Sequence, residues 1–269
     1  MSEEVEKGLA VENDTPKSQM IPIQNFAPPQ HDMLIDCPSG EVKGVVFYPD
    51  ERLRIPSAVI TEFAPDGTPL PEIDGEPVSI DQLVADMATT MYSVGGIGLS
   101  AIQIGVPLRV FICDIFANIH APDKGGENQS QSQLLVAINP EIGWMSNEKW
   151  RVVEGCLSFP GINESVERPS ELGLRGFSRK GVPFALRAKG VLGRVILHEM
   201  DHLDGVTIID RVGRMQKKIV SKRMSRFHQM MRTDTIRVSE KRKYRKGELE
   251  GKIPSKKKRK KSKRRKRNG

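Results

Sequence analysis

Three stretches of the chain carry hydrophobic residues at the spacing of an amphipathic helix. The first, over residues 79–92, starts with a capping-box pattern at Ser79 and Gln82 and is followed by two glycines. The other two run over about 189–203 and about 215–230. The third helix is expected to carry one apolar face among basic residues, made of Met215, Ile219, Met224 and Phe227.

Short runs of β-branched and aromatic residues predict strands, most of them between the first and second helices. The predicted strands cover residues 108–116, 134–138, 150–157, 172–176 and 183–188. Strands and helices do not alternate one by one along the chain. We therefore expect an α+β fold with mixed or antiparallel sheets around a central helix, and a further helix near the C-terminus.

Charge divides the chain into an acidic body and a basic tail. The 269 residues have a formal net charge of +8, but residues 237–269 hold 18 Lys or Arg and only 3 Asp or Glu. The tail therefore carries +15 and the remainder −7. Prolines and polar residues interrupt any periodicity before residue 45. We expect a disordered leader over 1–44, a catalytic body over 45–235 and a disordered basic tail over 236–269.

Several classes of protein are excluded by composition. The longest apolar region, around 95–119, is interrupted by polar and charged residues and is unsuited to cross a membrane. The N-terminus has no apolar secretory core, and its early acidic residues are unlike a transit peptide. Three scattered cysteines do not form a disulfide framework. These features favour a cytoplasmic protein with no membrane partner.

The strongest local motif is His198-Glu199-Met200-Asp201-His202. Histidines four residues apart lie on one face of a helix and can bind the same metal ion. Glu199 stands beside the first of them and can act as general base toward a water at the metal. A chance pair of histidines is the plain alternative, but the chain has only five. The motif by itself is compatible with several metalloenzyme families.

A third protein ligand must come from elsewhere in the chain. One zinc peptidase pattern requires a histidine at position 208, where this chain has Ile208. Another takes a glutamate from a later helix, but Glu240 and Glu248 lie in the basic tail, a poor place for a buried ligand. Cys156 in Glu-Gly-Cys-Leu-Ser is the better candidate, because a thiolate suits a borderline-soft metal.

A glycine-rich segment over 96–103, Gly-Ile-Gly-Leu-Ser-Ala-Ile-Gln, completes the pattern. It lacks the third glycine and the preceding strand of a dinucleotide-binding loop, so no dinucleotide is expected. Together with 154–158 (Glu-Gly-Cys-Leu-Ser) and 197–203 (Leu-His-Glu-Met-Asp-His-Leu), in this order, it resembles peptide deformylase. Further similar stretches are 48–54 and 166–169, and the resemblance covers about 45–212.

Three positions depart from the family pattern. Ser100 replaces the usual first alanine of the glycine-rich motif, Leu197 replaces the usual glutamine before the first histidine, and Gly193 stands where alanine is frequent. None of these residues is an expected metal ligand, general base or amide donor. Loss of the glutamine removes a supporting hydrogen bond near the metal, so metal affinity and rate are the properties that the change concerns.

The resemblance implies removal of the N-terminal formyl group from formyl-methionine of nascent polypeptides, with release of formate. It implies one divalent metal held by Cys156, His198 and His202 on the central helix and the strand before it. Iron(II) is the family's usual metal, with zinc, nickel and cobalt as alternatives for this ligand set. The expected catalytic groups are Glu199 as base and, as oxyanion donors, the Gln103 side chain and the Leu157 backbone N–H. The expected substrate-binding residues are Ile97, Gly98, Glu154, Val191, Arg194 and Val195.

A second function class is compatible with the basic residues. The protein could be a ribosome- or RNA-binding protein whose folded body is mainly a platform for the tail, since basic segments bind phosphate backbones without sequence specificity. The plain alternative is a solubilising or localisation segment. Because deformylases act on chains leaving the ribosome, both functions are compatible, with ribosomal RNA bound by the basic C-terminal helix and the tail.

Overall fold

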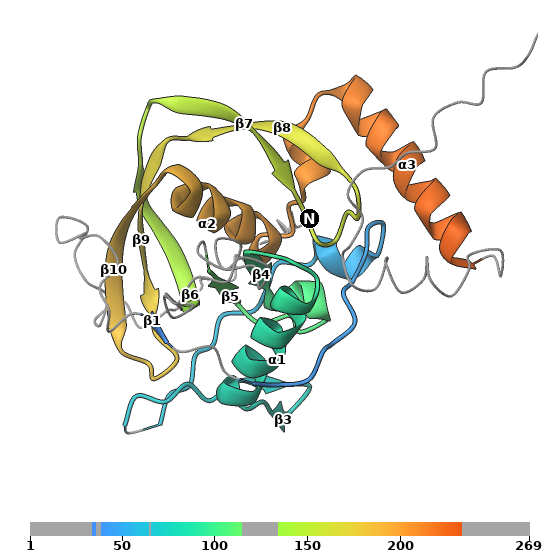
Figure 1. The fold of residues 1–269 in the computed structure, drawn as a ribbon. Helices are drawn as coiled ribbons and strands as arrows, with labels where there is room; N and C mark the ends of the chain where they lie inside the picture. The colour runs from blue at the N-terminus through green and yellow to red at the C-terminus, as the bar shows by residue number, and fades with distance from the viewer. Residues whose placement is uncertain (1–33, 36–38, 65, 115–133, 233–269) are drawn as a thin grey trace, which may run out of the picture.

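The computed structural model describes residues 34–35, 39–64, 66–114 and 134–232 (Figure 1). The predicted tail over 236–269 and most of the predicted leader lie outside these residues. Within them the chain forms three α-helices and three short 3-10 helices together with antiparallel sheets, which confirms the α+β prediction. No described helix is both long enough and apolar enough to span a lipid bilayer.

The largest sheet has six strands in the order β10-β9-β6-β5-β4, with β1 paired to β6 beside this path. All its pairings are antiparallel. Its strands are β1 (Leu34–Ile35), β4 (Gly98–Ser100), β5 (Val110–Cys113), β6 (Leu134–Met145), β9 (Glu171–Phe177) and β10 (Pro183–Lys189). Two hairpins stand apart from it: β2 (Glu72–Ile73) with β3 (Glu76–Pro77), and β7 (Lys149–Gly155) with β8 (Asn163–Pro169).

Two helices cover opposite faces of the large sheet. Val110 and Ile112 of β5 pack in the cluster that contains α1 (Ile80–Ser93), whereas Phe111 and Cys113 pack in the cluster that contains α2 (Gly190–Leu203). Because successive strand residues point to opposite faces, a strand buried on both sides must be apolar throughout. This explains the uninterrupted hydrophobic runs in β5 and at the start of β6, and it places α2 centrally (Figure 1).

All three predicted helices are present, and capping explains where the first one begins. The Ser79 hydroxyl accepts the N–H of Gln82 at 3.3 Å at the start of α1, as the capping pattern predicts. Gly95, with φ of 72°, follows its last residues. Three 3-10 helices lie between the longer elements: η4 (Glu51–Arg54), η5 (Ala101–Ile104) and η6 (Ile208–Arg211).

The last helix, α3 (Arg214–Arg232), buries only part of the face that was expected. Val220, Met224 and Phe227 are buried in a third cluster, while Met215 and Ile219 are 75% and 44% exposed. The prediction was wrong at the start of this helix, because the buried stripe runs through Val220 instead of Ile219. The partners of this stripe are Phe159 and Ile162 of the turn between β7 and β8, together with Ile208 and Ile209 of η6.

The described end of the predicted leader lies against α1. The backbone N–H groups of Gly40 and Lys43 donate to the hydroxyls of Thr89 and Thr90, both at 2.8 Å. Three residues further on, the backbone N–H of Val46 donates to the carbonyl of Gln103 at 2.7 Å. These bonds attach the segment 40–46 both to α1 and to the glycine-rich segment.

Candidate metal centre and catalytic cavity

The helix α2 carries the two histidines of the motif and Glu199 between them. Its apolar side, which includes Ile196, Met200 and Leu203, packs against the large sheet. His198 and His202 are one helical turn apart, with ring centroids 5.1 Å from each other. The helix therefore presents both imidazoles from neighbouring turns, as the spacing of the motif predicts.

Cys156 reaches the same place from the turn that follows β7. The strand ends at Gly155, and the backbone N–H of Phe159 donates to the Cys156 carbonyl at 2.9 Å, which closes the turn. The Cys156 Sγ lies 3.2 Å from His202 Nε2. One donor atom from each of Cys156, His198 and His202 lies within 4.8 Å of the others. The structure thus brings together the three residues expected to bind metal.

The residues of this cluster have the donor chemistry that a transition metal requires. One thiolate and two imidazoles suit iron, zinc, nickel and cobalt. The Glu154 carboxylate holds His198 Nδ1 at 3.1 Å, which leaves the other ring nitrogen available as a ligand atom. His202 Nδ1 is buried without a hydrogen-bond partner among the described residues. Of the alternative positions for a third ligand, Ile208 is buried beneath α3, and Glu240 and Glu248 lie outside the described residues.

Glu154 belongs to a buried ion network. Arg168 donates from Nε and Nη2 to its two carboxylate oxygens at 2.7 and 2.9 Å, and from Nη1 to Asp201 at 2.9 Å. Arg194 donates to Glu154 at 2.6 Å. Burial alone would raise the pKa of Glu154, but the hydrogen bonds from His198 and Arg168 hold this pKa at about 2. Glu154 is therefore a charged carboxylate that orients the imidazole of His198.

Glu199 is buried more deeply than Glu154. Its side chain is buried beside β4, and the Ser100 hydroxyl donates to its Oε2 at 2.7 Å. Burial raises the pKa of Glu199 to about 7, against the lowering effects of His198 and Ser100. A carboxyl group with a pKa near neutrality is well matched to taking up and releasing a proton.

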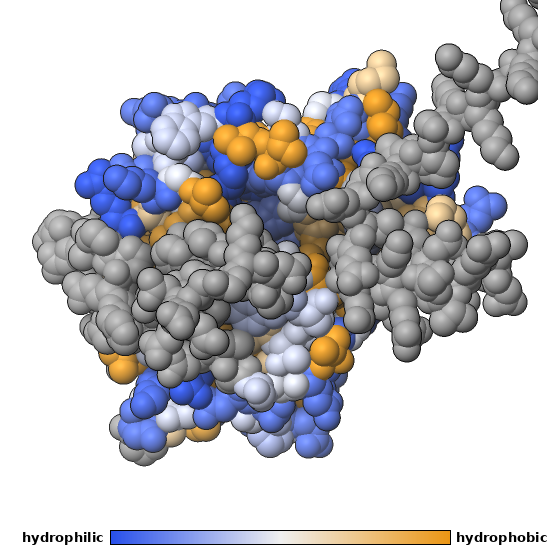
Figure 2. Space-filling model, in the orientation of Figure 1, coloured by the Kyte–Doolittle hydropathy of each residue, from blue (hydrophilic) through white to orange (hydrophobic). Residues whose placement is uncertain are grey.

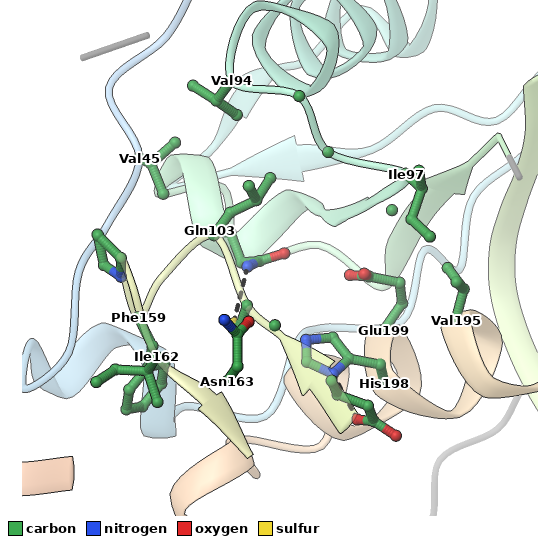
Figure 3. A pocket seen from close by; sticks show the side chains of 18 of the residues that line it. Val45, Val94, Ile97, Gln103, Phe159, Ile162, Asn163, Val195, His198 and Glu199 are labelled. Atoms are coloured by element: carbon green, nitrogen blue, oxygen red, sulfur yellow. Dashed lines mark hydrogen bonds and ion pairs between the residues drawn. The ribbon is translucent and has the colours of Figure 1, made fainter. Parts of the chain in front are cut away.

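Gln103 approaches the cluster from η5, on the opposite side from α2 (Figure 3). Its Oε1 accepts the backbone N–H of Ser100 at 2.9 Å, so its Nε2 is directed toward Ser158 Oγ at 3.1 Å and Cys156 Sγ at 3.8 Å. Leu157 follows Cys156 in the turn and packs against the α1 cluster. Both expected oxyanion donors are thereby adjacent to the Cys156 turn.

These groups open into a cavity of about 800 Å³. Figure 2 shows the molecule hollowed on this face, with hydrophobic surface at the rim. The residues expected to bind substrate all line the cavity, namely Ile97, Gly98, Glu154, Val191, Arg194 and Val195. Further lining comes from the chain before η4 and from α3, including Val42, Val45, Phe47 and Met231. These four contributions were not expected from the sequence.

Sequence reasoning also missed the residues that support the cluster. Arg168 lies within the stretch 166–169 that resembles the known family, but its ion pairs with Glu154 and Asp201 join residues up to 33 positions apart. Arg211 of η6 adds two hydrogen bonds to Asp201. The only signal in the sequence was an arginine within a stretch that resembles the family, shortly after the cysteine motif. The sequence of this stretch does not show which acidic residues the arginine contacts.

The sequence is similar to known enzymes over most of the described region. The sequence model of the polypeptide deformylase family matches residues 42–218. A peptide deformylase of Bartonella bacilliformis is 37% identical over 187 residues, which cover 69% of this chain and 92% of the relative. One from Rhizobium meliloti is also 37% identical, over 69% of this chain and 93% of the relative.

Solved structures show the same similarity in three dimensions. A Legionella pneumophila peptide deformylase aligns with a TM-score of 0.57 and 29% identity, over 71% of this chain and 99% of the other. A peptide deformylase from Synechococcus elongatus in complex with actinonin aligns with a TM-score of 0.58 and 29% identity, over 71% of this chain and 94% of the other. The family match over 42–218 includes the three motifs, α2 and the strands from β2 to β10.

Proposed function

Because the chain belongs to the peptide deformylase family, whose members are metal-dependent hydrolases that remove the N-terminal formyl group of nascent peptides, we propose that Cys156, His198 and His202 hold its metal. The convergence of one sulfur and two imidazole ligands beside Glu199 is the observation that carries this assignment. When bound, the divalent metal supplies the Lewis acidity that brings the pKa of a water molecule toward neutrality.

Glu199 is the proposed general base and acid. It takes a proton from the attacking water as the water oxygen bonds to the formyl carbon, and it gives a proton to the amide nitrogen as the C–N bond breaks. The products are formate and a free N-terminal amine. Its burial beside the cavity and its pKa of about 7 support this role, because the carboxyl group can both accept and return the proton near neutral pH.

The Gln103 Nε2 and the Leu157 backbone N–H are the proposed donors to the oxygen of the formyl group as it gains negative charge. The fixed orientation of the Gln103 amide supports this role, since Ser100 holds its oxygen and leaves the NH₂ group facing the Cys156 turn. Donors that are already oriented need no reorganisation during the reaction.

The substrate methionine is proposed to lie among Ile97, Gly98, Val191, Val195 and the aliphatic part of Arg194, with the peptide extended along the cavity. The Arg194 guanidinium is occupied by Glu154, by the Val166 carbonyl and by the Trp150 carbonyl. Because these acceptors occupy the guanidinium, the charge of Arg194 is neutralised by protein groups and only its aliphatic part is proposed to contact the methionine side chain. An unbranched, polarisable side chain such as methionine suits this lining.

We propose iron(II) as the physiological metal, with zinc, nickel and cobalt as the alternatives that the ligand set also accepts. The test is a formate-release assay on a formyl-methionine peptide with the full chain loaded anaerobically with each metal in turn. We expect the iron(II) form to be several-fold more active than the zinc form and to lose activity in air. Equal activity with zinc would contradict the iron assignment, and no formate with any of the four metals would contradict the proposed metal centre.

The catalytic domain is proposed to cover 45–235, between the leader 1–44 and the tail 236–269, and the family match over 42–218 supports all of it except the last residues, 219–235. We propose the cytoplasm as its location, because nascent formyl-methionine peptides are made there.

Ribosomal RNA is the proposed docking partner. The exposed side of α3 supports this, since it carries Lys217, Lys218, Lys222 and Arg226, and the basic residues of 237–269 follow this helix in the sequence.

Ending the chain after Ile236 tests the docking proposal. We expect unchanged formate release from short peptides, weaker binding to ribosomes, and a shallower dependence of binding on salt, because the slope follows the number of phosphate contacts. The matched control is a full-length chain with the residues of 237–269 in scrambled order, which should bind like the original sequence. Binding of the shortened chain that equals the original across a salt titration would refute a role for the tail.

A further inference from the structure

Of the three residues that depart from the family pattern, Ser100 is the one that contacts the carboxylate of Glu199, the proposed general base. It is fully buried at the end of β4, and its hydroxyl is within hydrogen-bond distance of two oxygens of Glu199: Oε2 at 2.7 Å and the backbone carbonyl at 3.0 Å. Among the described residues, no other hydrogen-bond donor to the Glu199 carboxylate is found. The usual alanine at this position would have no hydroxyl to offer.

The Ser100 hydroxyl determines which oxygen of the Glu199 carboxylate faces the cavity. A Cβ atom built on Gly98 would lie 2.5 Å from Glu199 Oε1, so Oε1 points toward the backbone of Gly98, which lines the cavity. Since Ser100 binds Oε2, Oε1 is left as the oxygen on the cavity side. Glycine is required at position 98 for this close approach, because any side chain there would displace the carboxylate.

Ser100 also holds the side-chain amide of Gln103, because the Ser100 backbone N–H donates to Gln103 Oε1 at 2.9 Å. Ser100 therefore contacts two of the proposed catalytic groups, one with its side chain and one with its main chain. Ser100 does not line the cavity, so its hydroxyl cannot attack a substrate carbonyl. Its contacts allow it to act only through its neighbours.

We propose that Ser100 is a positioning residue for deformylation, whose hydroxyl holds the Glu199 carboxylate with one oxygen turned toward the substrate. This inference rests on the proposed function, in which Glu199 is the general base. A catalytic group must be held within a few tenths of an ångström of its productive geometry, and buried hydrogen bonds of this kind supply the restraint. The serine at this position thus replaces an apolar contact with an oriented polar one.

The test is the variant Ser100→Ala in the metal-loaded full chain. We expect kcat for formate release to fall about tenfold with KM unchanged, because Glu199 acts in the transition state and not in binding the ground-state peptide. The metal content and the absorption spectrum of the cobalt-loaded protein should match the wild type. The backbone N–H that holds Gln103 is retained in this variant, so the experiment isolates the hydroxyl.

Ser57→Ala is the matched control, since it removes another buried hydroxyl, one that has no hydrogen-bond partner among the described residues. We expect its kcat and KM to equal those of the wild type. Unchanged kcat in Ser100→Ala, an equal loss in both variants, or a change in KM alone would overturn the inference. If Glu199→Ala is inactive while Ser100→Ala matches the wild type, only the positioning role fails; if Glu199→Ala stays active, the proposed base itself is wrong.

Discussion

Replacing Glu199 with alanine is expected to lower kcat for formate release by about 10³-fold, because general acid–base groups typically contribute about 10²–10⁴-fold. The variant should keep its metal, since Cys156, His198 and His202 and the Glu154 carboxylate behind them are unchanged. The loss should appear in kcat more than in KM, because the carboxylate handles protons and does not bind the methionine side chain.

The measurement is steady-state formate release from a formyl-methionine peptide, with bound metal determined on the same sample. Glu199→Gln preserves the shape and the hydrogen bond from Ser100 but cannot accept a proton, so it should be as inactive as the alanine variant. Glu141→Ala, which removes a carboxylate paired with Arg175 on the large sheet, is the control for a general effect on folding. A rate near that of the wild type in Glu199→Gln would show that another group is the base.

Replacing Arg168 with methionine is expected to lower the free energy of unfolding by about 3–5 kcal/mol, the usual cost of removing one partner from a buried ion network. The Arg168 side chain is only 4% exposed, and its loss takes hydrogen bonds from Glu154, from Asp201 and from the Leu197 carbonyl. Metal affinity should fall by about 10–100-fold as well, because Glu154 orients the ring of His198.

Urea unfolding at a fixed metal concentration, followed by a metal-binding titration, measures both effects. The matched control is Arg151→Met on the neighbouring strand β7. Arg151 pairs with Glu167 at 3.0 Å, but their side chains are 62% and 47% exposed, so its loss should cost less than about 1 kcal/mol. Similar losses in both variants would mean that the buried network contributes no more than a surface ion pair.

The elements with a clear hydrophobic period were predictable from the sequence. Helices α1 and α2 follow the predicted ranges closely, and β5 and the first part of β6 were found because a strand segment buried on both faces is apolar along its length. The face of α3 was predicted correctly at Met224 and Phe227 and wrongly at its start, because Val220 and Ile219 are equally apolar neighbours and only the tertiary contact with the β7–β8 turn selects between them.

Strand β8 shows why the remainder was not predictable. Its inward positions are Glu164, Val166 and Arg168, so two of its three buried side chains are charged and the hydrophobic alternation of a strand is absent. These charges are tolerated because each meets a partner from a distant part of the chain, such as Gln216 at 2.8 Å from Glu164. A sequence pattern contains no information about such pairings.

The candidate site also contains some residues that the sequence could predict and others that depend on contacts between distant parts of the chain. The proposed metal ligands and the proposed general base could be picked out because they belong to short motifs of chemically distinctive residues, and the structure brings the three proposed ligands together. The contact of Ser100 with Glu199 spans 99 positions and joins two residues whose types are unremarkable in isolation. The cavity walls from Val42 and Met231 were missed because they depend on where both ends of the body lie in the fold.

The spread of the cavity walls has a consequence for the synthesis of the protein itself. One wall comes from residues 42–45, and another from Met231 near the end of α3. A growing chain folds from its N-terminal end as it emerges from the ribosome. The cavity therefore becomes complete only after α3 has emerged, and a chain that stops before this helix lacks both that wall and the packing beneath the Cys156 turn. A chain that ends before α3 is therefore expected to contain all three motifs but no complete cavity.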